Sequence, residues 1–72
     1  MLTLTPRKML IARAQAYAYT NVKQGLIPLA EVHLSTVLRR FDDMMENKPT
    51  DSAGYWAGFY FNEFIGACEN MG

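Results

Sequence analysis

The chain has 72 residues, and seven basic residues balance seven acidic ones, so that its formal net charge is zero. Binding to nucleic acid or to an anionic membrane surface depends on an excess of Lys and Arg, which this chain lacks. Half of the residues are apolar, which argues against disorder. The length predicts one small domain over residues 1–72, whose core only just offsets the entropy of the chain.

The single cysteine excludes an internal disulfide, so oligomerisation is the simplest source of further stability. Residues 1–5 show neither the basic region nor the long apolar run of a secretory signal. The longest aromatic stretch is interrupted by Asn62 and Glu63 and falls short of the about 20 apolar residues that cross a bilayer. A free thiol without an export signal predicts a cytoplasmic protein with no membrane partner.

A first helix is predicted over residues 6–24. The Thr5 hydroxyl is suited to the N-cap, Pro6 to the first helical position and Gly25 to the position just after the end. The apolar face of this helix contains several alanines and is therefore shallow, which permits close packing against a second helix. Its members are Leu10, Ile11, Ala14, Tyr17, Ala18 and Val22.

A second helix is predicted over residues 28–47, beginning at Pro28. It is the most clearly amphipathic segment, with one apolar face and one charged face at the helical period. The connection from the first helix is short, so the two helices should be antiparallel neighbours. The apolar face consists of Ala30, Leu34, Val37, Leu38, Phe41, Met44 and Met45.

The charges of these two helices support the hairpin. Arg7 and Lys8 lie at the positive end of the first helix, and Asp42, Asp43 and Glu46 lie at the negative end of the second, so each group opposes its own helix dipole. An antiparallel hairpin places the two ends side by side, where the groups can pair. The rival interpretation, in which Arg7 and Lys8 mark a site for phosphate or an acidic partner, is less favoured.

A third, aromatic-rich helix is predicted over residues 52–69, after a connection in which Pro49 ends the second helix and Asp51 or Ser52 provides a cap. Its glycines and aromatics would also suit a strand, but residues 55–61 show no apolar/polar alternation. The fold class is therefore all-α, a three-helix protein built on an antiparallel helical hairpin. The residues expected to be most buried are Leu34, Phe41, Trp56, Tyr60 and Phe64.

Small side chains recur at every fourth position of the third helix, at Gly54, Gly58, Asn62 and Gly66. The helix is also apolar over about half of its circumference, which is wider than the usual apolar stripe. It could be a central core helix with large aromatics, or a helix packed on both sides. The second interpretation is favoured, and it predicts a homodimer with these four residues at the interface.

The sequence contains no catalytic, metal-binding or cofactor-binding signature, so the protein is expected to be a non-enzyme. His33 is the only histidine and lacks a visible partner for general-base chemistry, which favours a structural or surface role. Cys68 has no basic neighbour that would lower its pKa and is expected to be a buried, inert thiol. The carboxylates of Asp42, Asp43 and Glu46 are interpreted as a solvated helix end.

These features predict a protein-interaction module, a regulator, inhibitor or adaptor that covers a surface on another protein. Exposed aromatics supply large contact area at low entropic cost, and Tyr19, Tyr55 and Phe59 are the expected contact residues. Small proteins of this type are common in phages and other mobile elements. A helix-turn-helix DNA reader using Arg39 and Arg40 and a structural subunit of a larger assembly remain the alternatives. Against DNA, the acidic residues that follow at once would repel phosphate.

Overall fold

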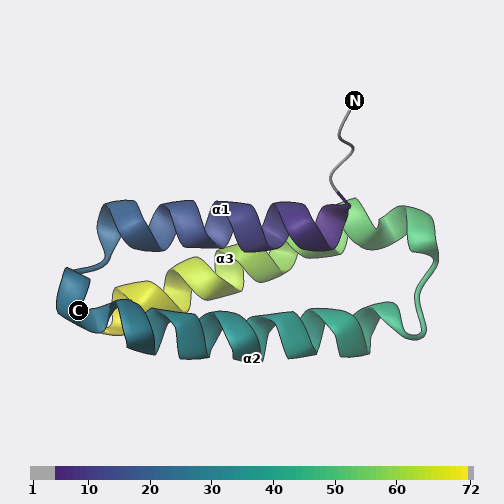
Figure 1. Ribbon diagram of the computed structural model, residues 1–72. Helices are drawn as coiled ribbons and strands as arrows, with labels where there is room; N and C mark the ends of the chain where they lie inside the picture. The colour runs from purple at the N-terminus through teal and green to yellow at the C-terminus, as the bar shows by residue number, and fades with distance from the viewer. Residues whose placement is uncertain (1–4, 72) are drawn as a thin grey trace.

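The computed structural model describes residues 5–71 and contains three α-helices joined by short turns (Figure 1). The helices are α1 (Pro6–Asn21), α2 (Ile27–Met45) and α3 (Ala53–Met71), with 3₁₀ turns η1 (Gln24–Leu26) and η2 (Thr50–Ser52) between them. The described residues contain no strand, so the predicted all-α three-helix fold is confirmed. The expectation about a leader rests mainly on residues 1–4, which lie outside the described range.

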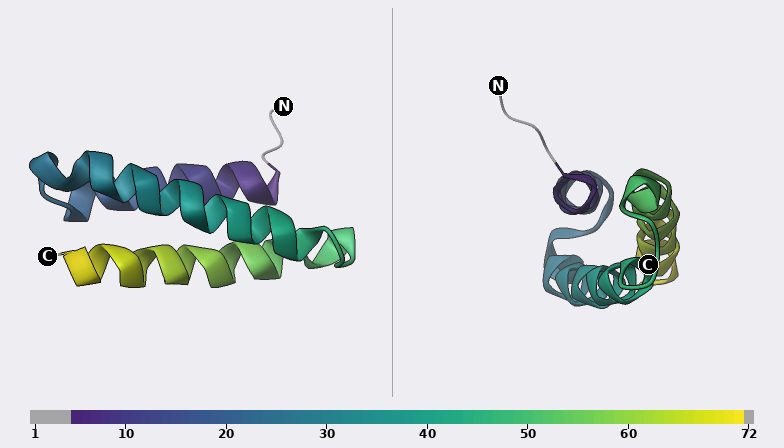
Figure 2. Two further views of the ribbon diagram at one scale, coloured as in Figure 1. Left: turned by 90° about the horizontal axis from the view of Figure 1, so that it is seen from below. Right: turned by 90° about the vertical axis from the view of Figure 1, so that its right-hand side faces the viewer.

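The helices form a compact bundle in which α3 packs against both members of a hairpin. α1 and α2 are antiparallel neighbours, as predicted, and α3 runs in the same direction as α1, crossing behind the pair in Figure 1. The end view in Figure 2 shows the three helices at the corners of a triangle. One side of α3 therefore faces the hairpin, and the opposite side faces outward.

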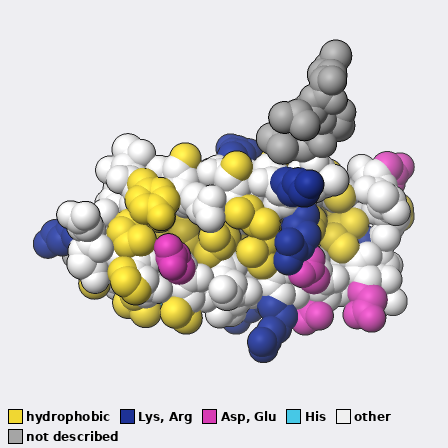
Figure 3. Space-filling view, in the orientation of Figure 1, with side chains coloured by type: hydrophobic (Ala, Val, Ile, Leu, Met, Phe, Trp, Pro, Cys, Tyr) yellow, Lys and Arg dark blue, Asp and Glu magenta, His cyan; other side chains and the backbone are white. Residues whose placement is uncertain are grey.

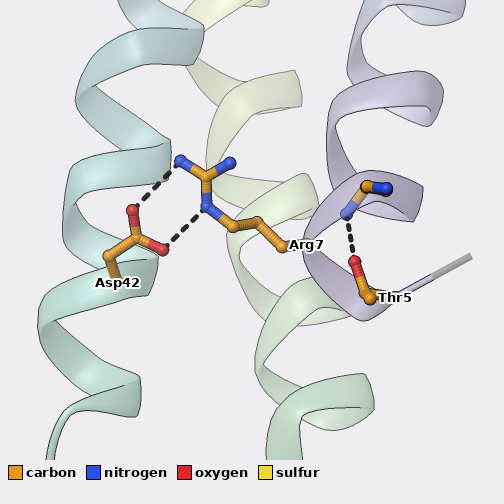
Figure 4. Close-up of polar contacts among 4 residues, drawn as sticks. Thr5, Arg7 and Asp42 are labelled. Atoms are coloured by element: carbon orange, nitrogen blue, oxygen red, sulfur yellow. Dashed lines mark hydrogen bonds and ion pairs between the residues drawn. The ribbon is translucent and has the colours of Figure 1, made fainter.

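α1 begins as predicted but ends earlier. The Thr5 hydroxyl accepts a hydrogen bond from the backbone N–H of Lys8 at 3.2 Å, which satisfies one of the free donors of the first turn (Figure 4). The predicted end near residue 24 is wrong, because Val22 turns extended (φ −105°, ψ 137°) directly after Asn21. Gly25 lies in η1 without a positive φ, so the 3₁₀ turn, rather than a left-handed glycine, reverses the chain.

The other two helices differ from their predicted limits by one or two residues. α2 includes Ile27, carries Pro28 in its first turn and ends at Met45. The chain then passes through η2, which the hydroxyl of Ser52 closes by donating to the carbonyl oxygen of Pro49 at 2.6 Å. α3 continues to Met71, two residues beyond the predicted end.

The core lies between the three inward faces. α3 supplies its residues at helical spacing, and Phe64 is the largest of the fully buried side chains, with 1% of its surface exposed. Where α1 and α2 meet, Ala14 and Ala30 are completely buried, which allows the two backbones to approach closely, as the alanine-rich faces predicted. The buried set is Leu10, Ala14, Ala18, Ala30, Leu34, Val37, Phe41, Ala57, Tyr60, Phe64 and Cys68.

Four of the five residues expected at the centre of the core are buried there, but Trp56 is only half-buried. At 100° per residue, Trp56 lies about 80° around α3 from Phe64, at the edge of the inward face. There its ring meets the α2–α3 connection, and the Lys48 ammonium group lies 5.6 Å from the ring centroid. The prediction failed because an aromatic residue at the edge of an apolar arc can border solvent.

An ion pair joins the open ends of the hairpin, as predicted. The Arg7 guanidinium donates through Nε and an Nη to the two carboxylate oxygens of Asp42, at 2.9 and 3.1 Å (Figure 4). The hydrogen bond and the negative charge of Asp42 raise the pKa of Arg7 above its ordinary value. Both side chains are about half exposed, so the pair helps orient the helices more than it stabilises them.

Removing the Phe41 ring should strongly destabilise the fold. Phe41 is 3% exposed and meets Tyr60 edge to face, with ring centroids 6.3 Å apart. Phe41→Ala is expected to lower the free energy of unfolding by about 3–5 kcal/mol, measured by urea or thermal denaturation. Val32→Ala, at an exposed position of the same helix, serves as the control and should change stability by less than about 0.5 kcal/mol. Equal melting of the two variants would show that Phe41 is not a core residue.

Breaking the ion pair should have a small effect that depends on salt. Asp42→Asn keeps the size of the side chain and removes its charge, and we expect a loss of about 0.2–1 kcal/mol at low ionic strength. The loss should shrink at high ionic strength, because salt screens exposed charges. A double-mutant cycle with Arg7→Gln isolates the pair, and a coupling free energy indistinguishable from zero at low salt would contradict the assigned orienting role.

Candidate protein-interaction surface

Three large aromatic side chains are exposed in the described structure. Tyr55 and Phe59 lie on α3, with 69% and 42% of their surfaces exposed, and Tyr19 lies on α1 with 69% exposed. These are the three residues that the sequence marked as contact candidates. The structure separates them into two surfaces.

Tyr55 and Phe59 belong to one aromatic cluster, formed with Trp56 and Tyr60 on the first half of α3. The Trp56 ring meets Tyr55 edge to face at 5.0 Å between centroids and Phe59 at 5.5 Å. Phe59 in turn meets Tyr60 at 5.1 Å. Each edge-to-face contact of this kind adds about 0.5–1.5 kcal/mol beyond the burial of area.

The aromatic cluster is anchored in the core. Tyr60 is buried, and its ring packs edge to face against Phe41 of α2. A continuous series of ring contacts therefore runs from a core residue to the exposed rings of Tyr55 and Phe59. Side chains supported in this way lose little further freedom when a partner covers them, which favours binding.

The glycine row, Gly54, Gly58, Asn62 and Gly66, runs beside the aromatic cluster. A methyl group added at any of the three glycines would meet no atom of the described structure within 4 Å, apart from the local helix backbone and chain neighbours. Packing within the chain thus does not require glycine here, although each glycine costs about 1 kcal/mol relative to alanine in a helix interior. The side of α3 that was predicted to pack closely against another helix is therefore uncovered in the single chain.

The outward side of α3 is almost without charge. Between Ala53 and Cys68 the helix carries one charged residue, Glu63, whose carboxylate lies 3.6 Å from the Arg40 guanidinium of α2. The Glu63 carboxylate therefore lies at the edge of α3 that faces α2. The other residues of this segment that are classed as exposed are uncharged: Gly54, Tyr55, Phe59 and Asn62.

Tyr19 belongs to a different surface. It lines a shallow furrow between α1 and α2, with Ile27 and Leu34 on the opposite wall and Phe64 at its floor. This furrow lies on the face seen in Figure 3, where hydrophobic side chains gather along the line between the two helices. The end of α1 that carries Tyr19 and the start of α3 lie at opposite ends of the bundle (Figure 1). One flat partner surface therefore cannot cover both groups.

Two members of the exposed surface were not predicted as contact residues. Trp56 was assigned to the core, yet its half-exposed ring links Tyr55 to Phe59. Lys48 lies between the predicted second helix (28–47) and third helix (52–69), and its ammonium group lies over the Trp56 ring. The partial exposure of Trp56 could have been expected from the sequence, because this residue lies at the edge of the apolar arc. The approach of Lys48 depends on the path of the α2–α3 connection.

The candidates for polar chemistry occupy ordinary structural positions. His33 is half-buried at the edge of the α2 apolar face. Cys68 is buried, as predicted, and burial raises the pKa of its thiol. Within residues 5–71, no group of three or more His, Cys, Asp and Glu side chains is placed to hold a metal ion. In the same range, no helix combines the length and the apolar character needed to cross a bilayer.

Comparison with known proteins does not identify a family. No protein-family model matches the chain, and neither a curated protein nor a solved structure is significantly similar to it.

The Cys68 thiol should react slowly in the folded protein. Its burial restricts access, and its raised pKa lowers the thiolate fraction near neutral pH. We expect alkylation by iodoacetamide at pH 7.5 to be at least about tenfold slower than for the chain unfolded in guanidinium chloride. The reaction is followed by mass spectrometry, and equal rates in both states would show that the thiol is accessible.

Proposed function

We propose that this protein is a protein-interaction module that acts as a regulator, inhibitor or adaptor by covering a surface on another protein with the outward side of α3. The observation that carries the proposal is the anchored aromatic cluster of Tyr55, Trp56, Phe59 and Tyr60. It combines exposed rings at its outer end with a buried ring at its inner end. Such residues supply most of the binding free energy in protein interfaces.

The charges near this surface also favour a protein partner over nucleic acid. Arg40, one of the two arginines considered for DNA contact, is close to Glu63, and Arg7 is engaged by Asp42. Asp43 is exposed on α2 beside them. Binding of a duplex depends on clustered, available positive charge, and these carboxylates oppose it. The proposal includes a cytoplasmic location and a role other than catalysis.

A photo-crosslinking experiment tests where the partner binds. The photoreactive residue p-benzoylphenylalanine is placed at position 55 or, as a matched control, at position 19, because Tyr55 and Tyr19 are equally exposed. After irradiation in the cells that produce the protein, position 55 should yield a discrete adduct with another protein, identified by mass spectrometry. Crosslinking from position 19 alone would place the contact on the α1–α2 face and overturn the assignment to α3.

Truncation of the exposed ring should weaken binding of the partner identified in this way. We expect Tyr55→Ala to raise the dissociation constant by about tenfold or more, measured by isothermal titration calorimetry with purified partner. Tyr19→Ala removes the same group from an equally exposed site and should change the constant by less than about twofold. Circular dichroism before titration confirms that both variants remain helical. Equal effects of the two substitutions would contradict a contact centred on the aromatic cluster.

A further inference from the structure

We propose that the outward side of α3 binds a second copy of this chain, with the two α3 helices antiparallel across a twofold axis that passes between Gly58 and Asn62. This inference rests on the proposed function, because it uses the same surface and assigns a second copy as its occupant when no other protein is bound there. In this arrangement, Tyr55 and Phe59 of one copy pack against the second half of α3 in the other copy, where the outward side chains are small.

The shape of the surface supports this arrangement. On the outward side of α3, the first half presents the large rings of Tyr55 and Phe59, which protrude into solvent. One and two turns further on, the same side presents Asn62 and Gly66, and a methyl group added to Gly66 would meet open space. The surface is thus raised at one end and low at the other.

Two copies of such a surface fit together in one direction only. In an antiparallel pair, the raised end of each copy meets the low end of the other, and a twofold axis creates the same contact twice. With the axis between Gly58 and Asn62, Gly58 stands opposite Asn62 of the second copy, and the ring of Tyr55 stands level with the step between Ile65 and Gly66. A parallel pair would instead set ring against ring and leave the small residues uncovered.

The charge distribution agrees with contact between identical surfaces. A twofold axis brings each group near it close to its own copy, so a charge there would meet a like charge. The described part of α3 carries a single charge before Glu69, that of Glu63, and Arg40 lies 3.6 Å from it. Lys48 and Asp51 lie at the raised end and Glu69 at the low end. In an antiparallel pair Glu69 of one copy would attract Lys48 and repel Asp51 of the other. The preference for the antiparallel arrangement therefore comes from shape.

Sedimentation equilibrium tests the self-association. The unmodified chain should show a concentration-dependent shift from monomer to dimer within the micromolar range. Gly66→Leu fills the low end of the surface and should raise the dimer dissociation constant by about tenfold or more. Ala16→Leu adds similar bulk on the exposed side of α1 and should leave the constant unchanged. Circular dichroism checks that both variants remain helical.

Mixing two variants tests the antiparallel register. In a pair formed by Gly66→Leu and Tyr55→Ala chains, one Tyr55 meets an unmodified Gly66, and the added Leu meets the shortened Ala. The mixture should therefore form heterodimers about tenfold or more tighter than the Gly66→Leu homodimer. No gain on mixing would overturn the register, because a parallel pair places positions 55 and 66 at different ends.

A chain that remains monomeric at high micromolar concentration would overturn self-association. The proposed function would survive that result if position 55 still crosslinks to a different protein. Conversely, a dimer broken by Gly66→Leu, together with crosslinks from position 55 only to a second copy, would support the dimer and contradict binding to another protein through this face. The two proposals therefore fail separately.

Discussion

The fold depends on the packing of α3 against both helices of the hairpin. The contact between α1 and α2 is made largely by alanines, with Ala14 and Ala30 completely buried, so it brings the backbones close but buries little side-chain area. α3 adds the large buried rings of Tyr60 and Phe64 to this hairpin. Phe64 lies at the centre, where its ring meets Tyr17 of α1 at 6.4 Å, and Tyr60 meets Phe41 of α2 at 6.3 Å. Without α3 the hairpin would have little core.

This dependence explains why one side of α3 is left open. Three helices at the corners of a triangle each cover the others over part of their circumference (Figure 2). α1 and α2 cover only the side of α3 that carries Phe64 and Tyr60, and Tyr55 and Phe59 lie outside this sector. The ring contacts cross the boundary between these sectors, so the packing that stabilises the core also holds the exposed rings in place.

The ion pairs of the hairpin and of its α3 edge help orient the helices more than they stabilise the fold. Arg7 is unfavourable at the start of α1, and Asp42 is unfavourable near the end of α2, when each helix is considered alone. Their bidentate pair across the hairpin offsets both, because antiparallel helices bring the two ends together. On the α3 edge, Arg40 and Glu63 make a looser contact at 3.6 Å. Both pairs lie at the surface, which leaves the interior apolar.

The sequence by itself determined the three helices, the antiparallel hairpin, the meeting of basic and acidic groups at its open end, and the burial of Phe41, Tyr60 and Phe64. These follow from the helical period, from proline and cap positions, and from the shortness of the connections, all of which are local. Only the tertiary structure decided that Trp56 is half-exposed and that Tyr19 is remote from Tyr55. Periodicity gives the angle of a residue around its own helix, but the sector that is covered depends on where the other helices lie. The open glycine row is likewise a property of that arrangement, because small residues can equally well face a neighbouring helix of the same chain.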